Sequence, residues 1–420
     1  MVSCRRCEER KMEISKKIAE HIEEVVELRR DFHRYPELGL QEYRTSEKVS
    51  SYLTDCGLEV RSLNRTGVVG LLRGDLTGPT LMIRADMDAL PIQEENDVPY
   101  KSLNPGVMHA CGHDAHAAML LVAAKILSDL KPKLKGNIKF VFEPNEENVG
   151  ALAMIQQGLM EDPRVDACLG LHVWTPIGIG QIAVKEGPVM AAMEHFRLVV
   201  KGRGGHTATP QTAVDPILAA ADIIQGVQII QTREIDVLRE PTIIMFGKIE
   251  GGSTTNVIPD SVSLSGTMRY LFQGAEKNED NPKRRFERIV ANICKVHRAG
   301  YELSFMHGHP KLVNHGEMTE IIRSIAAHEL NPAPEIISFV SMAGEDFSEF
   351  AARAPSAFYF LGAGNAAKKT CFPHHHPRFD IDEDVLGVGV EMHVRSAMAF
   401  FENAGNLRFL KTTSYNGGGS

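Results

Sequence analysis

The feature that most constrains the fold is an alternation of short β-branched runs with longer helical patterns in the first third of the chain. Residues 68–74 (VVGLLRG) and 80–86 (TLMIRAD) are predicted strands joined by a turn that contains glycine and proline. A helical pattern follows at about 115–130, and residues 137–144 (NIKFVFEP) form the next predicted strand. Strand, helix and strand at this spacing predict a right-handed βαβ unit in a parallel or mixed sheet.

A second pattern can be read separately from the rest of the chain. Its elements follow the order strand, helix, strand, strand, helix, strand, from FRLVVKG to YELSFMHG. This is the βαββαβ order of ferredoxin-like domains. A length of 420 residues also favours two domains. We therefore expect an α/β protein with a discontinuous domain formed by 1–194 and 308–420, and an inserted ferredoxin-like domain at 195–307.

Composition excludes several classes of protein. The chain has 46 Lys and Arg against 54 Asp and Glu, so its net charge of −8 gives no general attraction to nucleic acid or to an anionic membrane. No apolar run is long enough to span a bilayer, and the charged start MVSCRRCEERK lacks the apolar core of a signal peptide. The seven cysteines are scattered, so we expect reduced thiols, a cytoplasmic location and no function for the CxxC of Cys4 and Cys7.

The densest group of reactive side chains lies in MHACGHDAH. Cys111 and His113 flank a single glycine, and in extended backbone residues i and i+2 project to the same side. A thiolate and an imidazole suit zinc, and nearby carboxylates also admit manganese, cobalt or nickel. The alternative is an ordinary buried cysteine. Asp114 is expected to cap the following helix, while His109 and His116 either support the site or lie on the surface.

Carboxylates and further histidines follow other predicted strands. Glu146 and Glu147 are adjacent in FVFEPNEEN, so that one can bind a metal ion while the other faces the water that the ion activates. His172 ends an apolar run in CLGLHVW, where burial costs free energy unless the ring nitrogens are bound. A histidine triplet occupies 374–376. The alternatives are a surface glutamate pair, a satisfied core histidine and a solvated histidine loop.

The inserted domain contributes two glycine-rich turns. His206 lies in GRGGHTATP and Asn256 in GGSTTNVIP, where glycines permit close approach to a ligand. Neither turn has the GxxxxGK[ST] spacing of a phosphate-binding loop, which argues against nucleotide binding.

Taken in order, these motifs resemble the M20 family of metallopeptidases and amidohydrolases, especially its aminoacylase, hippurate hydrolase and auxin-conjugate hydrolase branch. The resemblance extends from about His33 to Ala399. The motifs that support it are DFHRYPELGLQEYRTS, RADMDALPIQE, GVMHACGHDAH, FEPNEE, GLHVW, GRGGHTATP, GGSTTNVIPD, GTMR, AGEDF and HHHPRFDIDED. It implies that the discontinuous domain is catalytic and that the insert is a lid and dimerisation domain.

The resemblance also implies roles for single residues. The ligands of a centre with two divalent ions, Mn²⁺ or Zn²⁺ with Co²⁺ or Ni²⁺ as alternatives, would be Cys111, His113, Glu147, His172 and His375. Glu146 would be the general base, and Asp86 would orient a ligand. His206 would stabilise the oxyanion, reaching the other subunit's site in a homodimer. Asn256 would bind the carboxylate of the substrate, and Arg269 is a second candidate for that task.

The implied activity is a metal-dependent amidohydrolase that cleaves N-acyl or N-aroyl amino acids into a carboxylic acid and a free amino acid. A carboxypeptidase or dipeptidase on the same scaffold is the first alternative, and a non-catalytic amino-acid-binding protein is the second. The sequence departs from the family pattern at Glu143 and Asn145, where FEPNEE replaces the usual FQPAEE, and at Gln211, where histidine is frequent. These departures leave the acyl group and the amino acid open.

Overall fold

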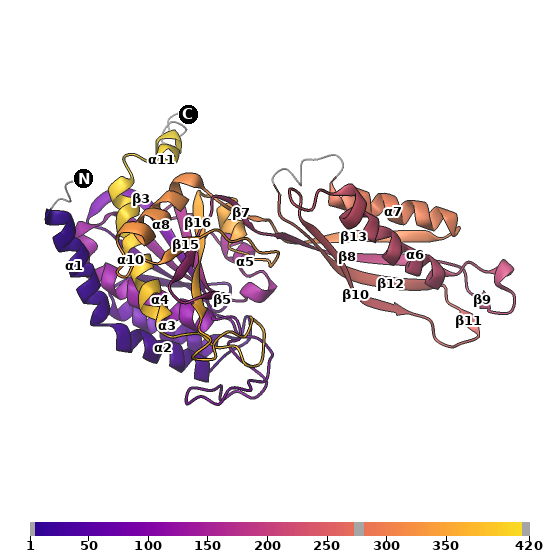
Figure 1. Ribbon diagram of the computed structural model, residues 1–420, viewed down its shortest axis with the longest axis horizontal. Helices are drawn as coiled ribbons and strands as arrows, with labels where there is room; N and C mark the ends of the chain where they lie inside the picture. Colours follow the sequence, from indigo (N-terminus) through magenta and orange to yellow (C-terminus); the bar gives the residue numbers. More distant parts are fainter. Residues whose placement is uncertain (1–4, 273–280, 414–420) are drawn as a thin grey trace. The chain divides into compact units, whose positions relative to one another are not determined.

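The protein is described here by a computed structural model that covers residues 5–272 and 281–413 of the chain. The chain divides into two compact units, which are considered separately (Figure 1). The larger unit consists of Met1–Gly187, Val313–Phe339 and Asp346–Ser420, and the smaller of Pro188–Leu312 and Val340–Glu345. The smaller unit thus begins before the predicted insert at 195–307, ends after it, and includes a segment from further along the chain.

The larger unit is built on an eight-stranded mixed sheet. In spatial order its strands are β1 (Glu59–Leu63), β2 (Gly67–Arg73), β4 (Lys135–Glu143), β3 (Leu76–Asp86), β5 (Ala167–Gly178), β16 (Ser356–Gly364), β6 (Gln181–Ala183) and β15 (Glu335–Ile337). The central pairs β4/β3, β3/β5 and β5/β16 are parallel, whereas β1/β2, β2/β4 and β16/β6 are antiparallel. The α/β fold with a mixed sheet is therefore confirmed.

The parallel register fixes which residues meet at one edge of this sheet. Asp86, the last residue of β3, pairs with Glu143, the last residue of β4. Arg84 of β3 pairs with Gly170 of β5, so that Asp86 and His172, each two residues further along, lie at nearly the same level in the sheet. Because crossover helices cover parallel strands, these strands are buried along most of their length. The carboxyl ends of β3 and β4 therefore meet beside the middle of β5.

Helices of the larger unit pack around the sheet. They are α1 (Arg5–Ala19), α2 (Ile22–Arg34), α3 (Tyr43–Asp55), α4 (His113–Asp129), α5 (Ala151–Gln156), α8 (Gly316–His328), α9 (Ser348–Ala351), α10 (Val385–Asn403) and α11 (Arg408–Thr413), with the 3₁₀ turns Lys131–Lys133 and η2 (Glu146–Asn148). Helix α4 is apolar nearly all round, and it packs against α2, α10 and β3. It begins at His113, two residues before the predicted start.

Gly112 precedes α4 and has a left-handed backbone with φ of 94°. An added Cβ atom would lie 2.4 Å from Cγ2 of Val173 on β5. Glycine is thus required between Cys111 and His113 both for its conformation and for the close approach of β5.

The smaller unit has the predicted βαββαβ order: β8 (Ala192–Lys201), α6 (Pro216–Ile229), β10 (Thr242–Gly251), β12 (Ser261–Tyr270), α7 (Pro282–Val296) and β13 (Gly300–His309). The antiparallel sheet has the order β10-β12-β8-β13. Short additional elements of this unit are β9 (Gly205–His206), the 3₁₀ turn Pro210–Thr212, the π-turn Ile230–Glu234 and β11 (Val257–Ile258). The strands β7 (Gly187–Met190) and β14 (Leu312–Asn314) each include residues of both units.

Sequence signals explain where both helices of this unit begin. Asp215 and Asn281 accept hydrogen bonds from backbone N–H groups of the first turns of α6 and α7, and each is followed by proline. The apolar faces of the helices cover one face of the sheet, where Phe196 and Phe286 lie in the core.

Within the described ranges, none of the helices combines the length and apolarity that crossing a membrane requires. The cysteines at 56, 111, 168, 294 and 371 are free thiols. Cys4 and the side chain of Cys7, which form the CxxC of the sequence, lie outside what the structure describes.

Candidate metal centre

All five side chains that were predicted to bind metal lie in the larger unit, where they meet at one edge of its sheet. Cys111 and His113 come from the start of α4, and His172 projects from β5. Glu147 lies in the turn η2, directly after β4, and His375 lies in the loop between β16 and α10. The parallel register of β4, β3 and β5 places Glu147 and His172 at the same end of the sheet, and the start of α4 and the loop between β16 and α10 supply the other three side chains.

The donor atoms form two overlapping groups that have the Cys111 thiol in common. Donor atoms of Cys111, His113 and His172 lie within 4.8 Å of one another, and so do those of Cys111, Glu147 and His375. Cys111 Sγ is 3.5 Å from Nε2 of His172, and Nε2 of His375 is 3.2 Å from Oε1 of Glu147. We refer to these five residues as the donor cluster.

Glu146 lies next to the donor cluster. Donor atoms of Glu146, Glu147 and His113 lie within 4.8 Å of one another and form a third group. Oε2 of Glu146 is 3.9 Å from Nε2 of His113. Both glutamates therefore lie near the His113 ring, and Glu147 also contacts His375.

The surroundings of the donor cluster are strongly anionic. Burial by itself lowers the pKa of His113, but the carboxylates of Asp86 and Asp88 outweigh burial and raise it to about 10. A positive charge at this ring is thus favoured, whether a proton or a cation supplies it. At His172 burial and the neighbouring rings of His116 and His374 lower the pKa well below the usual range, and the opposing effect of Asp86 is too weak to offset them.

Asp86 makes its short contact with a histidine outside the donor cluster. Its Oδ1 is 2.6 Å from Nδ1 of His116, and its Oδ2 is 3.7 Å from Nε2 of His113. Nε2 of His116 accepts a hydrogen bond of 2.9 Å from the backbone N–H of Val173. His116 therefore carries its proton on Nδ1 and donates it to Asp86, which fixes the ring beside His172. The sequence had left His116 between a supporting and a surface role.

Asp88 has a positioning role that the sequence did not reveal. Its two carboxylate oxygens accept hydrogen bonds of 3.0 and 3.2 Å from the backbone N–H groups of Glu146 and Glu147. Its carbonyl oxygen lies 2.8 Å from Nδ1 of His113, so this ring donates from Nδ1 and turns Nε2 toward the donor cluster. The only signal in the sequence was a second carboxylate two residues after Asp86.

Asp114 does not cap α4, so that prediction was wrong. Its carboxylate is fully buried and accepts from Nε of Arg29 at 2.8 Å, and it lies 2.7 Å from Nδ1 of His33. Two cationic partners on α2 bind this carboxylate more strongly than exposed N–H groups of the first turn would. His109 is also buried, and neither ring nitrogen makes a hydrogen bond among the described residues.

Only one member of the histidine triplet joins the donor cluster. His374 stacks on Trp174 with a centroid distance of 4.2 Å, and its Nε2 lies 3.0 Å from the carbonyl oxygen of Val173. His376 stacks on Phe372. His375, between them, has a left-handed backbone with φ of 65°, and its N–H donates to the carbonyl of Ala110.

The smaller unit holds the other three predicted site residues. His206 and Asn256 line one hollow formed by the glycine-rich turns at 204–206 and 252–261. Nδ1 of His206 accepts from the N–H of Ala208 at 3.0 Å, which leaves the proton on Nε2. Arg269, on β12, is not among the residues that line this hollow, and its Nη1 donates to the carbonyl of Met342.

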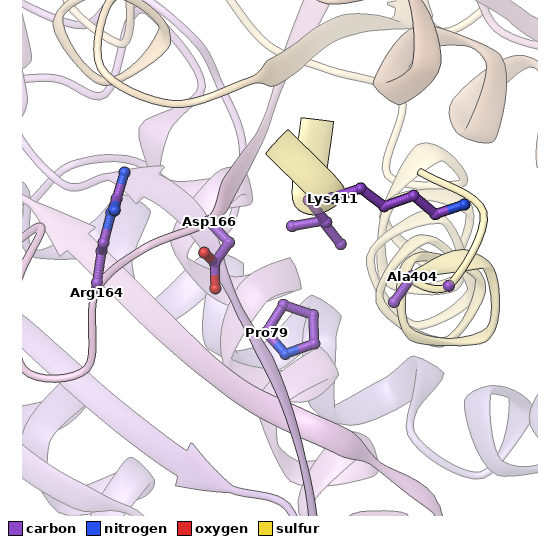
Figure 2. Close-up of a pocket in the computed structure, with 7 residues that line it drawn as sticks. Pro79, Arg164, Asp166, Ala404 and Lys411 are labelled. Atoms are coloured by element: carbon purple, nitrogen blue, oxygen red, sulfur yellow. The ribbon is translucent and has the colours of Figure 1, made fainter. Parts of the chain in front are cut away.

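A different hollow of the larger unit lies at the opposite end of the central strands. Figure 2 shows Pro79 and Asp166, which lie near the amino ends of β3 and β5, together with Arg164, Ala404 and Lys411. The donor cluster lies at the other end of the same strands, where active sites of parallel α/β sheets are found.

The two-unit α/β fold and the donor cluster are those expected of a metal-dependent hydrolase. The sequence profile of Peptidase family M20/M25/M40 matches residues 82–399. The chain therefore belongs to this family, as the sequence motifs had indicated.

Individual relatives span nearly the whole chain. Thermostable carboxypeptidase 1 of Saccharolobus solfataricus is 37% identical over 93% of this chain and 99% of its own length. N-acetyl-L-cysteine deacetylase of Bacillus subtilis is 36% identical over 91% of this chain and 88% of its own. The crystal structure of the YXEP protein of Bacillus subtilis, described as a dinuclear metal-binding peptidase of the M20 family, superimposes with a TM-score of 0.79. It is 30% identical and covers 91% of this chain and 99% of that chain.

Proposed function

We propose that this protein is a metal-dependent amidohydrolase that cleaves N-acyl or N-aroyl amino acids. The main support is the convergence of two donor groups that have the Cys111 thiol in common with a neighbouring glutamate, Glu146, whose carboxylate lies within 4.8 Å of donor atoms of His113 and Glu147. The deacetylase among the relatives and the dinuclear metal-binding structure support the same proposal.

The donor cluster fits divalent transition-metal ions. Thiolate, imidazole and carboxylate are the side chains that bind such ions, and two groups that have one residue in common suit a pair of them. Nε2 of His113 is buried and accepts no hydrogen bond among the described residues, as expected of a nitrogen that serves a cation. The five residues of the donor cluster would hold two ions, Mn²⁺ or Zn²⁺ with Co²⁺ or Ni²⁺ as alternatives. When bound, such ions polarise a carbonyl group and lower the pKa of water.

Glu146 would act as the general base and acid. Its carboxylate would take a proton from the attacking water and return it to the departing amine nitrogen, because an amine is too basic to leave as an anion. The side chain is only partly exposed, at 12%, and Asp88 holds its backbone N–H in place. Both features favour a fixed carboxylate at the edge of the donor cluster.

His206 and Asn256 would act on the substrate from the smaller unit. The proton on Nε2 of His206 suits stabilisation of the oxyanion, and a lost donor of that kind typically costs roughly 3–4 kcal/mol of barrier. Asn256, which lines the same hollow, would bind the carboxylate of the substrate. Arg269 is a second candidate for that carboxylate, because it is a half-buried cation. We further propose that His206 acts across a homodimer.

A substrate panel tests the proposed reaction. The protein, loaded with Mn²⁺ or Zn²⁺, is offered N-acetyl and N-benzoyl amino acids, and their C-terminal amides serve as matched controls. We expect release of the free amino acid from the first group and little from the amides, since these lack the carboxylate that Asn256 would bind. Absence of hydrolysis from every N-acyl amino acid, with both ions bound, would refute the proposed substrate class.

A carboxypeptidase or dipeptidase activity is the alternative, and the 37% identity to a thermostable carboxypeptidase favours it. Both activities require an amide bond next to a free carboxylate. A dipeptide panel run beside the N-acyl panel separates them, because the alternative predicts faster turnover of substrates that have a free amino terminus or a longer peptide.

A further inference from the structure

Arg84 is a fully buried arginine whose side chain contacts three carboxylates close to the donor cluster. Each nitrogen of the Arg84 guanidinium faces a different one: Nε is 2.6 Å from Oε2 of Glu143, Nη1 is 2.7 Å from Oδ2 of Asp86, and Nη2 is 3.1 Å from Oδ1 of Asp346. All four side chains have no exposed surface. We propose that Arg84 is a positioning residue that sets the geometry of the donor cluster through these three carboxylates.

The first path runs through Asp86. The carboxylate that receives the Arg84 hydrogen bond also binds His116, and His116 in turn binds the backbone of Val173, the residue after His172. The same carboxylate lies 3.7 Å from His113. Arg84 thus fixes Asp86 against the two histidines that α4 presents.

The second path runs through Asp346. While Oδ1 of Asp346 receives the Arg84 hydrogen bond, its Oδ2 accepts from the backbone N–H of Ala151 at 2.9 Å. Ala151 is the first residue of α5, which follows the turn that contains Glu146 and Glu147. The position of this turn is therefore tied to the same guanidinium, and Glu143 ties in the end of β4 directly before it.

The shape of the side chain explains why arginine is needed here. A guanidinium is planar and donates in several fixed directions, whereas the ammonium group of lysine is a point charge that cannot reach three separated carboxylates at once. Each buried carboxylate also needs its partner, because an uncompensated charge in the interior is costly. Arg84→Lys keeps the positive charge and removes only the set of hydrogen bonds in three fixed directions.

Metal affinity is the readout, so the test does not depend on turnover. The inference rests on the proposed function, since it needs ions at the donor cluster. Metal-free wild type and Arg84→Lys are titrated with Zn²⁺ or Mn²⁺ against a chromophoric chelator, and unfolding is followed in parallel. Loss of such an orienting contact typically weakens metal binding about 10- to 100-fold, and we expect this for at least one of the two ions.

Arg395 provides a matched control. It is as deeply buried in the same unit and also contacts several polar partners, Glu391, Glu329 and Ser15, but none of these belongs to the donor cluster or its hydrogen-bond partners. Arg395→Lys should lower stability without changing either metal affinity. If Arg84→Lys does not fold, Asp346→Asn and its control Glu329→Gln repeat the comparison. Each of these variants removes one carboxylate charge beside the corresponding arginine.

Three outcomes are distinct. Weakened metal binding in the Arg84 or Asp346 variant, with the control variant at wild-type affinity, supports the inference. Wild-type affinity in a folded Arg84→Lys or Asp346→Asn variant overturns it and leaves the proposed function intact. A wild type that binds neither ion overturns the proposed function itself.

Discussion

Gly112 offers a quantitative test of how closely the donor cluster is packed. Gly112→Ala places a side chain in a left-handed conformation, which costs about 1–2 kcal/mol. It also places Cβ at 2.4 Å from Cγ2 of Val173, a fully buried side chain that cannot move aside, and such overpacking costs roughly a further 1–3 kcal/mol. We therefore expect the free energy of unfolding of the larger unit to fall by about 2–5 kcal/mol.

A second glycine separates the two contributions. Gly158 has a similar φ of 85°, but an added Cβ there would meet no atom within 4 Å. Gly158→Ala should therefore lose only the conformational share, about 1–2 kcal/mol. Denaturant unfolding of both variants gives the difference, and chelator competition gives the metal affinity, which should fall only for Gly112→Ala. Equal destabilisation of the two variants, with equal metal affinity, would refute the close packing of α4 against β5.

Three further predictions concern charge, ligands and assembly. Burial raises the pKa of Glu143 above its usual value near 4.5, so its favourable contribution is present below that pH and is lost as the pH rises through the raised pKa. Glu143→Gln should therefore gain stability relative to wild type as the pH rises above 4.5 toward the raised pKa, by up to about 1.4 kcal/mol per pH unit. A difference in unfolding midpoint that stays constant with pH would contradict this. His375→Ala should lower the bound metal in elemental analysis, whereas His376→Ala, which changes a residue stacked on Phe372, should keep it; equal metal content in both would remove His375 from the cluster. Mixed Glu146→Gln and His206→Ala subunits should recover part of the activity that each lacks alone, and no recovery after verified subunit exchange would exclude action across a dimer.

Much of the fold could be predicted because local patterns determine it. The apolar runs that became β3 and β4 and the helical pattern that became α4 gave the βαβ unit, and the six-element order gave the smaller unit. The one-glycine spacing of Cys111 and His113 also indicated that both side chains could face one ion. These features depend on residues close together in the sequence.

Other features depend on contacts between distant segments, and the sequence did not reveal them. Asp88 positions Glu146 and Glu147 through their backbone N–H groups, which have no sequence signature. Asp114 is bound by Arg29 and His33 of α2, so a local capping pattern was misleading. Residues 340–345 belong to the smaller unit although they follow a long segment of the larger one.

The most direct test of the account is the hydrolysis rate of Glu146→Gln at full metal load, measured on the best N-acyl amino acid found for the wild type. Glutamine keeps the shape of the side chain and cannot take up a proton, while the five residues of the donor cluster are unchanged. We expect wild-type metal content and a rate lowered by about 10²- to 10⁴-fold. A wild-type rate at full metal content would show that Glu146 is not the base, and it would contradict the proposed mechanism at its centre.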